Sequence, residues 1–330
     1  MASRITIDDI AEALGVSKTT VSRAISGKGR ISKDTTDRVR SYISEHNYKP
    51  NTYAKGLATQ RTFNIGVIWP GDAAMKDLPF FQKCLLGINK AATQQGYDIL
   101  LTILEEGDTS AIRRVTDNQK VDGIILTRTL VEDAPAQLLK ETGIPFVAVG
   151  SSADPEVLCA DSANETACLE LVKSMLQKQK DKIALLGGDT GHVITGTRLQ
   201  GFLRGCKEAG YPAEDSMIRL GMQTRSDVEE ALVDVMSAGT AAVIGMDDGI
   251  TREIIAVCQK REIEVPKDLR VASFYDSVFL ENTIPAVPAI HFDDMALGET
   301  AAHLLFRKMA GEEPESVMLD NYEIRMRETF

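Results

Sequence analysis

Apolar positions repeat at helical spacing three times within the first 46 residues. Positions 7, 10, 11 and 14 share one helix face behind Thr6, which can cap a helix, and Gly15 can end it. A second helix is predicted after Ser17, with apolar positions 21, 24 and 25. A third is predicted after Ser32, with apolar positions 39 and 43, and it runs toward His46. The segment is therefore predicted to fold as three short helices.

A tight turn joins the first two predicted helices. Its sequence is Gly15-Val-Ser17, and such a turn is typical of the helix-turn-helix, in which the second helix enters the major groove of DNA. The first exposed residues of that second helix are expected to be Lys18, Thr19 and Ser22. A three-helix packing unit without a nucleic-acid partner is the alternative interpretation of the same pattern.

From residue 64 onward the pattern changes to short apolar runs that alternate with helical segments. Such alternation predicts a parallel α/β sheet covered by helices. The runs form two sets that meet near residues 159–162. Strands are predicted at 65–69, 99–103, 123–126, 146–149, 183–186, 241–245 and 271–274.

Charge is distributed unevenly along the chain. The net charge is −11 over 330 residues, which by itself argues against a nucleic-acid partner. Residues 1–62, however, carry eleven Lys and Arg against six Asp and Glu, and the remainder carries 26 against 42. Basic side chains gain affinity by releasing DNA counterions, whereas an acidic body discourages indiscriminate binding. Only the N-terminal segment is therefore expected to touch DNA.

Length and composition narrow the class of protein further. A chain of 330 residues exceeds what one core usually organises, so two or three domains are expected. Residues 1–25 lack the apolar stretch of a signal peptide, and no run is long enough to span a membrane, so we expect a cytoplasmic protein. The five cysteines are scattered and form no Cys-x-x-Cys pair, which argues against a disulfide framework or a structural zinc site. Neither a metal nor a cofactor is expected.

Four segments of the N-terminal part carry a resemblance. They are Thr6-Ile-Asp-Asp-Ile-Ala, Gly15-Val-Ser-Lys-Thr-Thr-Val-Ser-Arg23, Asn47-Tyr-Lys-Pro-Asn51 and Ala54-x-x-Leu57, and together they resemble the DNA-binding head of the LacI/GalR family of bacterial transcriptional regulators. The resemblance implies a hinge helix that folds on the operator, where paired leucines of a dimer enter the minor groove. Leu57 is the matching leucine. The residues implied at the DNA are Thr6, Ser17, Lys18, Thr19, Thr20, Ser22, Arg23, Arg30, Asn51, Ala54, Leu57 and Ala58.

The resemblance extends over the rest of the chain. It implies an all-α helix-turn-helix head and hinge helix, followed by an α/β domain similar to periplasmic sugar-binding proteins, with two Rossmann-like parallel-sheet subdomains. The chain of such a protein crosses three times between the subdomains. The implied domains are a head at 1–49, a hinge and linker at 50–62, an N-terminal effector subdomain at 63–161 with 293–320, and a C-terminal effector subdomain at 162–292 with 321–330.

Small molecules bind at the carboxyl ends of parallel strands, and polar residues follow several of the predicted strands. The resemblance assigns them roles. Arg198 matches an arginine that donates paired hydrogen bonds to effector oxygens, and Asp276 matches an aspartate that accepts from the effector. Asp247 stands where lactose-type repressors have asparagine. The other implied effector contacts are Phe80, Phe81, Thr127 and His192.

Each of these residues also has a purely structural interpretation. Asp248 can cap the following helix, and Asp247 can share that role. Arg198 can pair with an internal carboxylate, and His192 can belong to a surface loop. Phe80 and Phe81 are adjacent, so at most one is expected to face the cleft. No single interpretation is selected by the sequence.

The effector class follows from the donors and acceptors. Two carboxylates and a guanidinium suit a polyhydroxyl compound that can both donate and accept, with Phe80 or Phe81 as an aromatic face. A sugar is therefore expected. A sugar phosphate is disfavoured because Asp247 and Asp276 would repel it, although Arg128 and His192 could compensate. A purine stays an alternative, because some members of the resembling family bind one.

Two other classes of protein fit parts of the sequence. A transport binding protein would share the large domain but would carry a secretory signal instead of a basic head. An enzyme could use Asp247, His192 and Arg198, but the sequence has no nucleophile elbow, phosphate loop, dinucleotide fingerprint or metal-ligand spacing. We therefore predict a non-enzymatic regulator, by analogy a repressor, that binds a near-palindromic operator as a homodimer.

Overall fold

The computed structural model describes residues 5–27, 29–46, 48, 56, 59–71, 78–105, 107–178, 181–211 and 217–329. The chain divides into two compact units, Met1–Thr62 and Phe63–Phe330. No helix in these described ranges is both long and apolar enough to cross a membrane.

The first unit contains three helices, α1 (Ile7–Leu14), α2 (Lys18–Ser26) and α3 (Lys33–Glu45). Their starts follow from the predicted caps. The Thr6 hydroxyl accepts from the Asp9 N–H at 3.3 Å, while the Asp9 carboxylate accepts from the Thr6 N–H at 2.7 Å. Gly15 ends α1 in the left-handed conformation, with φ at 64°. The three predicted helices are confirmed.

A small apolar core holds these helices together. Ile10 and Ala11 of α1, Val21 and Ala24 of α2, and Val39 of α3 are its buried residues. They are the positions that the helical spacing placed on the inner faces. Because this core is so small, little apolar burial stabilises the unit, and each buried side chain carries a large share of it.

The second unit is built on two sheets, each six-stranded within the described residues. The first has the strand order β11-β5-β4-β3-β1-β2, and the second has the order β12-β10-β9-β8-β6-β7. All pairings are parallel except that of β12, which runs antiparallel to β10. The strands of the first sheet are β1 (Asn64–Pro70), β2 (Asp98–Leu104), β3 (Gly123–Leu126), β4 (Phe146–Val149), β5 (Cys159–Ser162) and β11 (Val317–Leu319). Those of the second are β6 (Ile183–Leu186), β7 (Ile218–Arg219), β8 (Ala242–Gly245), β9 (Arg270–Ser273), β10 (Ala289–Phe292) and β12 (Tyr322–Arg325).

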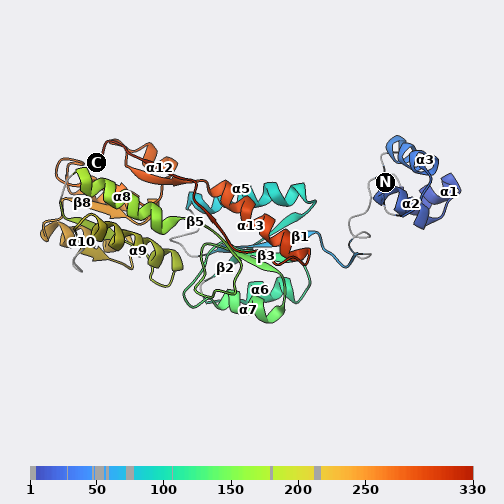
Figure 1. Ribbon diagram of the computed structural model, residues 1–330, viewed down its shortest axis with the longest axis horizontal. Helices are drawn as coiled ribbons and strands as arrows, with labels where there is room; N and C mark the ends of the chain where they lie inside the picture. Colours follow the sequence, from blue (N-terminus) through green and yellow to red (C-terminus); the bar gives the residue numbers. More distant parts are fainter. Residues whose placement is uncertain are drawn as a thin grey trace. The chain divides into compact units, whose positions relative to one another are not determined.

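Helices cover both faces of the first sheet, and we call this assembly the first lobe. α5 (Pro79–Gln94) and α13 (Asp294–Met309) lie side by side on one face, and α6 (Ser110–Thr116) and α7 (Ala134–Thr142) lie on the other (Figure 1). Two separate apolar clusters fill the spaces between these helices and the sheet. Strands β3, β4 and β5 are consequently buried along their whole length. The continuous apolar runs predict this for β3 and β4.

The second lobe comprises the second sheet and the helices α8 (Asn164–Lys178), α9 (Val193–Glu208), α10 (Arg225–Ser237), α11 (Asp248–Lys260) and α12 (Val278–Glu281). One continuous apolar cluster packs these helices against the sheet. The chain passes between the lobes after β5, after β10 and after β11. The carboxyl ends of strands in both lobes, and the loops that follow them, are therefore held close to these three connections.

Candidate functional site

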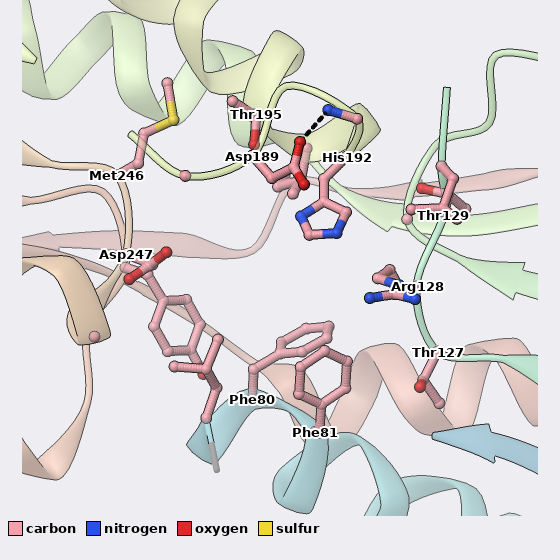
Figure 2. A pocket seen from close by; sticks show the side chains of 18 of the residues that line it. Phe80, Phe81, Thr127, Arg128, Thr129, Asp189, His192, Thr195, Met246 and Asp247 are labelled. Atoms are coloured by element: carbon pink, nitrogen blue, oxygen red, sulfur yellow. Dashed lines mark hydrogen bonds between the residues drawn. The ribbon is translucent and has the colours of Figure 1, made fainter. Parts of the chain in front are cut away.

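A cavity of about 1260 Å³ lies between the two lobes, bordered by the segments that follow the strands. The first lobe contributes Thr127 after β3 and Gly150 after β4. The second contributes His192 after β6, Asp247 after β8 and Tyr275 after β9. Figure 2 shows side chains from both lobes turned toward this space. We call it the cleft; it lies where ligands bind in parallel α/β sheets.

Arg198, on α9, borders the cleft and is held by neighbours of the second lobe. Its Nε donates to the Asn164 Oδ1 at 3.2 Å, and its Nη1 donates to the Met246 carbonyl at 2.7 Å. The guanidinium carbon lies 5.9 Å from the centre of the Tyr275 ring. An amide and a carbonyl, rather than a carboxylate, therefore orient this arginine. Its orientation is fixed before any ligand arrives.

Asp247, not Asp248, caps helix α11. Its Oδ1 accepts from the Ile250 N–H at 2.8 Å, and burial raises the pKa of its carboxyl. Asp248 is the first helical residue, and burial raises its pKa to about 6. Both carboxyls border the cleft. Asp247 thus combines the capping role and the cleft position that the sequence left as alternatives.

Tyr275 forms a polar link between the lobes that was not expected from the sequence. Its hydroxyl donates to the Asp294 Oδ2 at 2.5 Å, and Lys83 Nζ lies 3.6 Å from the same oxygen. Burial raises the pKa of Asp294 to about 6, against the opposing influence of Tyr275 and Lys83. Tyr275 and Asp294 both border the cleft. Tyr275 directly follows a predicted strand, but no sequence pattern marked Asp294 as its partner.

Asp276 does not border the cleft, contrary to the role that the resemblance implied. Its carboxylate accepts from both terminal nitrogens of Arg327, at 2.7 and 2.8 Å, and from Arg325 at 3.3 Å. Its side chain is 2% exposed. Neighbouring residues of an extended segment point to opposite sides, so Tyr275 takes the cleft position and Asp276 anchors the C-terminal segment.

The two adjacent phenylalanines of α5 both border the cleft, but to different extents. Phe81 is 2% exposed and its ring centre lies 5.7 Å from that of Trp69. Phe80 is half-buried, packs edge-on against Phe81 at 5.1 Å, and lies 6.2 Å from the Tyr275 ring. Phe80 therefore provides the aromatic surface that reaches across to the second lobe, while Phe81 supports it.

Backbone hydrogen bonds join the lobes on another side of the cleft. The Val131 N–H donates to the Gly191 carbonyl at 2.8 Å, and the Val193 N–H donates to the Thr129 carbonyl at 3.3 Å. Leu130 and His192 are the paired residues of this bridge. His192 also precedes α9 as its N-terminal flanking residue. The backbone bridge thus fixes the position of His192 beside the cleft.

Thr127 borders the cleft from the first lobe. The Thr127 hydroxyl donates to the Ile68 carbonyl at 2.7 Å and is buried, so its proton is already used in a hydrogen bond within the first lobe.

No group of three or more His, Cys, Asp and Glu side chains among the described residues is arranged to hold a metal ion.

The predicted DNA contacts of the head fall into three groups. Thr6 and Ser17 cap α1 and α2, and the Ser17 hydroxyl also lies 2.8 Å from the hydroxyl of Thr20. Lys18 is exposed on α2 and pairs with Asp8 at 2.6 Å. The other exposed positions are Thr19, Ser22, Arg23 and Arg30. The predicted hinge contacts Asn51, Ala54, Leu57 and Ala58 lie outside the described residues.

Two family models match the chain. The model described as "Bacterial regulatory proteins, lacI family" matches residues 6–51. The model described as "Periplasmic binding proteins and sugar binding domain of LacI family" matches residues 62–317. Together they cover both units.

Curated relatives match over most of the chain. The catabolite control protein A of Staphylococcus xylosus is 25% identical over 328 residues, covering 97% of this chain and 98% of the relative. The transcriptional regulator MalR of Streptococcus pneumoniae is 33% identical over 217 residues, covering 65% of this chain and 66% of the relative.

Solved structures share the fold over nearly the full length. A complex of the transcriptional regulator CelR with cellobiose has a TM-score of 0.74 at 24% identity, covering 99% of this chain and all of that one. A Lac repressor dimer bound to operator and an anti-inducer has a TM-score of 0.81 at 23% identity, covering 99% of each chain. This chain and the two solved structures therefore share the same fold.

Proposed function

The chain belongs to the LacI family of bacterial regulatory proteins, and we propose that it is a repressor whose operator binding is controlled by a sugar held in the cleft. The observation that carries this proposal is the composition of the cleft wall. A fixed guanidinium, buried carboxyls and an aromatic face surround one cavity between two lobes. The basic helix-turn-helix unit supplies the part that reads DNA.

The cleft groups match the chemistry of a sugar. Vicinal hydroxyls donate to carboxylates such as Asp247 and accept from the Arg198 guanidinium, and the apolar face of a sugar ring packs on an aromatic ring such as Phe80. Asp248 and Asp294 also border the cavity. A phosphorylated sugar would approach these three acidic side chains, which disfavours it. One structural relative was solved with cellobiose.

In the head, we propose that the exposed side chains of α2 read the DNA bases. Lys18, Thr19 and Ser22 are exposed near the start of this helix, the end that contacts base edges in helix-turn-helix proteins. Arg30 is assigned to the phosphate backbone, where it would add affinity without sequence preference. Leu57 is assigned to the minor groove.

A homodimer is proposed because the first lobe exposes apolar side chains close together. Leu101 and Ile103 are 46% and 57% exposed on one face of β2, which is an edge strand. Leu86, on the adjacent α5, is 57% exposed. A second copy would cover this surface and would supply the second head for a near-palindromic operator. The protein is proposed to work in the cytoplasm, where the chromosome lies.

We propose a binding role without catalysis, because the curated relatives are regulators. Effector binding would change how the two lobes close and thereby how the two heads of a dimer are spaced on DNA. The sugar would leave the cleft unchanged. Chromatography of a sugar incubated with the purified protein should recover it intact, and steady conversion would contradict this part of the proposal.

The test combines DNA binding and effector binding. A duplex selected from a random library is titrated by fluorescence anisotropy, with and without candidate sugars. Trp69 is the single tryptophan of the chain and packs against Phe81 beside the cleft, so its emission reports sugar binding. We expect one sugar class to change both signals. If sugars change neither signal, the proposed function is wrong.

A variant pair makes the test specific. Arg198→Ala should weaken sugar binding at least tenfold, because the removed guanidinium leaves effector oxygens unsatisfied in a closed cleft. DNA binding without sugar should be unchanged. Arg204→Ala is the matched control, since Arg204 lies on the same helix but is exposed and pairs with Glu165. Equal losses in both variants would show that the effect is not specific to the cleft.

A further inference from the structure

The polar groups that border the cleft can be divided into two clusters, with Asp247 and Arg128 at opposite ends. We call the first, made of Arg198, Asp247, Tyr275 and Asp294, the Arg198 cluster. We call the second, made of Arg128, Asp189 and His192, the Arg128 cluster. Figure 2 shows Asp247 and Arg128 on opposite sides of the cavity, with Phe80 and Phe81 along one wall between them. The cleft therefore offers two polar ends and an apolar middle.

The volume of the cavity is larger than that of a single sugar ring. Pockets for drug-sized ligands measure roughly 300–1,000 Å³, and a hexose, with roughly 12 non-hydrogen atoms, is smaller than such ligands. The cavity here measures about 1260 Å³. A single ring bound to the Arg198 cluster would leave most of this volume, and the other polar end, to water.

The large volume does not arise from lobes that stand apart. Two backbone hydrogen bonds already join residues 129–131 of the first lobe to residues 191–193 of the second, and the Tyr275 hydroxyl already reaches Asp294. The lobes thus touch at two separate places while the cavity between them keeps its size. The contacting lobes therefore enclose a space that can hold a ligand longer than one sugar ring.

The Arg128 cluster has the features of a recognition site. Arg128 is half-buried, and burial lowers the pKa of its guanidinium, while Asp133 and Asp189 oppose that shift. The Asp189 Oδ1 accepts from the Gly191 N–H at 2.7 Å, which fixes the carboxylate beside the backbone bridge. The planar Arg128 guanidinium and the oriented Asp189 carboxylate both border the cleft and offer it hydrogen-bond donors and acceptors. This is the combination that vicinal hydroxyls of a sugar satisfy.

We propose that the effector is a neutral oligosaccharide of at least two sugar units, one held by the Arg198 cluster and the next by the Arg128 cluster. The apolar face of the chain of rings lies on Phe80, between the clusters. This inference rests on the proposed function and narrows its ligand class. A purine or a single hexose would reach only one cluster, and an anionic sugar would meet the carboxyls of Asp247 and Asp294 in the Arg198 cluster.

The first test is a series of ligands of increasing length on the unaltered protein. Calorimetry and Trp69 emission are used to compare hexoses, α- and β-linked disaccharides, and the corresponding trisaccharides. We expect at least one disaccharide or trisaccharide to bind tenfold or more tightly than each of its component hexoses. If a hexose binds as tightly as every longer sugar that contains it, the inference is overturned, while sugar control of DNA binding can stand.

The second test separates the two clusters by substitution. Arg128→Ala should weaken oligosaccharide binding at least tenfold and should leave the weaker hexose binding within threefold of the original value. Arg198→Ala should weaken both. Arg113→Ala is the matched control, because Arg113 is exposed on α6 of the same lobe and does not border the cavity. If Arg128→Ala leaves oligosaccharide affinity unchanged, the Arg128 cluster is not a subsite.

A second substitution of Arg128 distinguishes a folding defect from a loss of sugar binding. Arg128→Lys retains the charge but loses the planar fork, so it should fold even if the alanine variant does not, and it should show an intermediate loss. Thermal melting confirms that each variant is folded. Absence of binding by sugars of every length, with DNA binding intact, would overturn the proposed function itself together with this inference.

Discussion

The head and the cleft are assembled in opposite ways. The head is one continuous stretch in which caps, helix faces and glycine ends are all local, so Thr6, Ser17 and Ser32 begin the three helices. The cleft instead joins side chains from α5 to α13, far apart in the chain. Local patterns therefore determine the head, whereas strand order and the direction of each strand end determine the cleft.

The head and the large unit also differ in the amount of apolar burial that stabilises them. The head depends on five buried apolar residues, whereas the large unit is stabilised by three extensive apolar clusters. A single defect in the head core should therefore abolish its function. In the large unit, a defect beside the cleft should change binding or stability by a limited amount.

Val39→Asp should eliminate specific DNA binding. Val39 is fully buried in the head core, and a carboxylate there has no partner, so the three helices should unfold. Operator affinity measured by anisotropy should fall at least a hundredfold, since the loss exceeds about 3 kcal/mol. Sugar binding and the melting of the large unit should be unchanged.

Ser41→Asp is the matched control for Val39→Asp. Ser41 is exposed on the same helix, so the variant adds the same charge without disturbing the core. Only a small, salt-dependent loss of affinity is expected. Equal losses in the two variants would mean that charge, and not the core, determines the effect. A loss of sugar binding in Val39→Asp would contradict the independence of the two units.

Asp276→Ala should destabilise the large unit more than it weakens sugar binding. The substitution leaves Arg327, 13% exposed, without its paired carboxylate, which costs about 3–5 kcal/mol for a buried pair. Urea unfolding followed by circular dichroism measures this loss. Glu323→Ala is the control, because Glu323 is 64% exposed and also pairs with Arg325, and exposed pairs contribute about 0–1 kcal/mol.

The opposite result for Asp276→Ala would restore its role as an effector contact. That result would be unchanged stability with sugar affinity lowered tenfold or more. Tyr275→Phe provides the complementary measurement. It removes the hydroxyl that donates to Asp294 but keeps the ring beside Phe80, so it should alter sugar binding and leave the Asp276 network intact.

Asp276 illustrates how far the sequence could predict the site. The strand before it was predicted correctly to within one residue, and the segment was expected at the ligand. Which of two adjacent side chains faces the cleft depends on the direction of the chain where the strand ends, and no local pattern records that direction. Arg325 and Arg327 could not be predicted as partners, because β12 pairs with β10 from the far end of the chain.

The same distinction applies to the remaining residues. Arg198 was expected beside the cleft because of the resemblance, and it borders the cleft. The pairing of Tyr275 with Asp294 was not expected, since it depends on how the two lobes meet. The helices of the head and strands β1, β3, β4, β6, β8 and β9 were predictable because caps and apolar runs do not require knowledge of distant partners.

Asp294→Asn should remove a pH dependence of stability. Burial raises the pKa of Asp294 to about 6 from its usual 3.8. The folded protein therefore favours the protonated carboxyl, so the favourable contribution of this group is full below about pH 4 and is lost as pH rises through 6. The loss is about 3 kcal/mol, at about 1.4 kcal/mol per pH unit.

Urea unfolding at intervals between pH 4 and 7 measures the Asp294 contribution. The free energy of unfolding of the unaltered protein, relative to Asp294→Asn, should fall over this range and level off above pH 7. Asp98→Asn, an exposed substitution on β2, is the control for loss of one charge. A difference that stays constant from pH 4 to 7 would show that the Asp294 carboxyl is not destabilised by burial.

The smallest effects on DNA binding are expected from substituting two exposed basic side chains of the head, Lys18 and Arg30. Lys18 begins α2 and pairs with Asp8, but both are more than half exposed, so the pair should open easily when DNA approaches. Lys18→Ala should cost about 1–3 kcal/mol on the preferred duplex and much less on others, relaxing the preference at one base position. Arg30→Ala should weaken binding to all duplexes alike and reduce the salt slope by about 1, as expected for one lost phosphate contact. Anisotropy titrations against a set of single-base variants at three salt concentrations distinguish the two effects. If Lys18→Ala lowers affinity uniformly while Arg30→Ala changes base preference, the roles are exchanged, and the orientation proposed for α2 in the major groove is wrong.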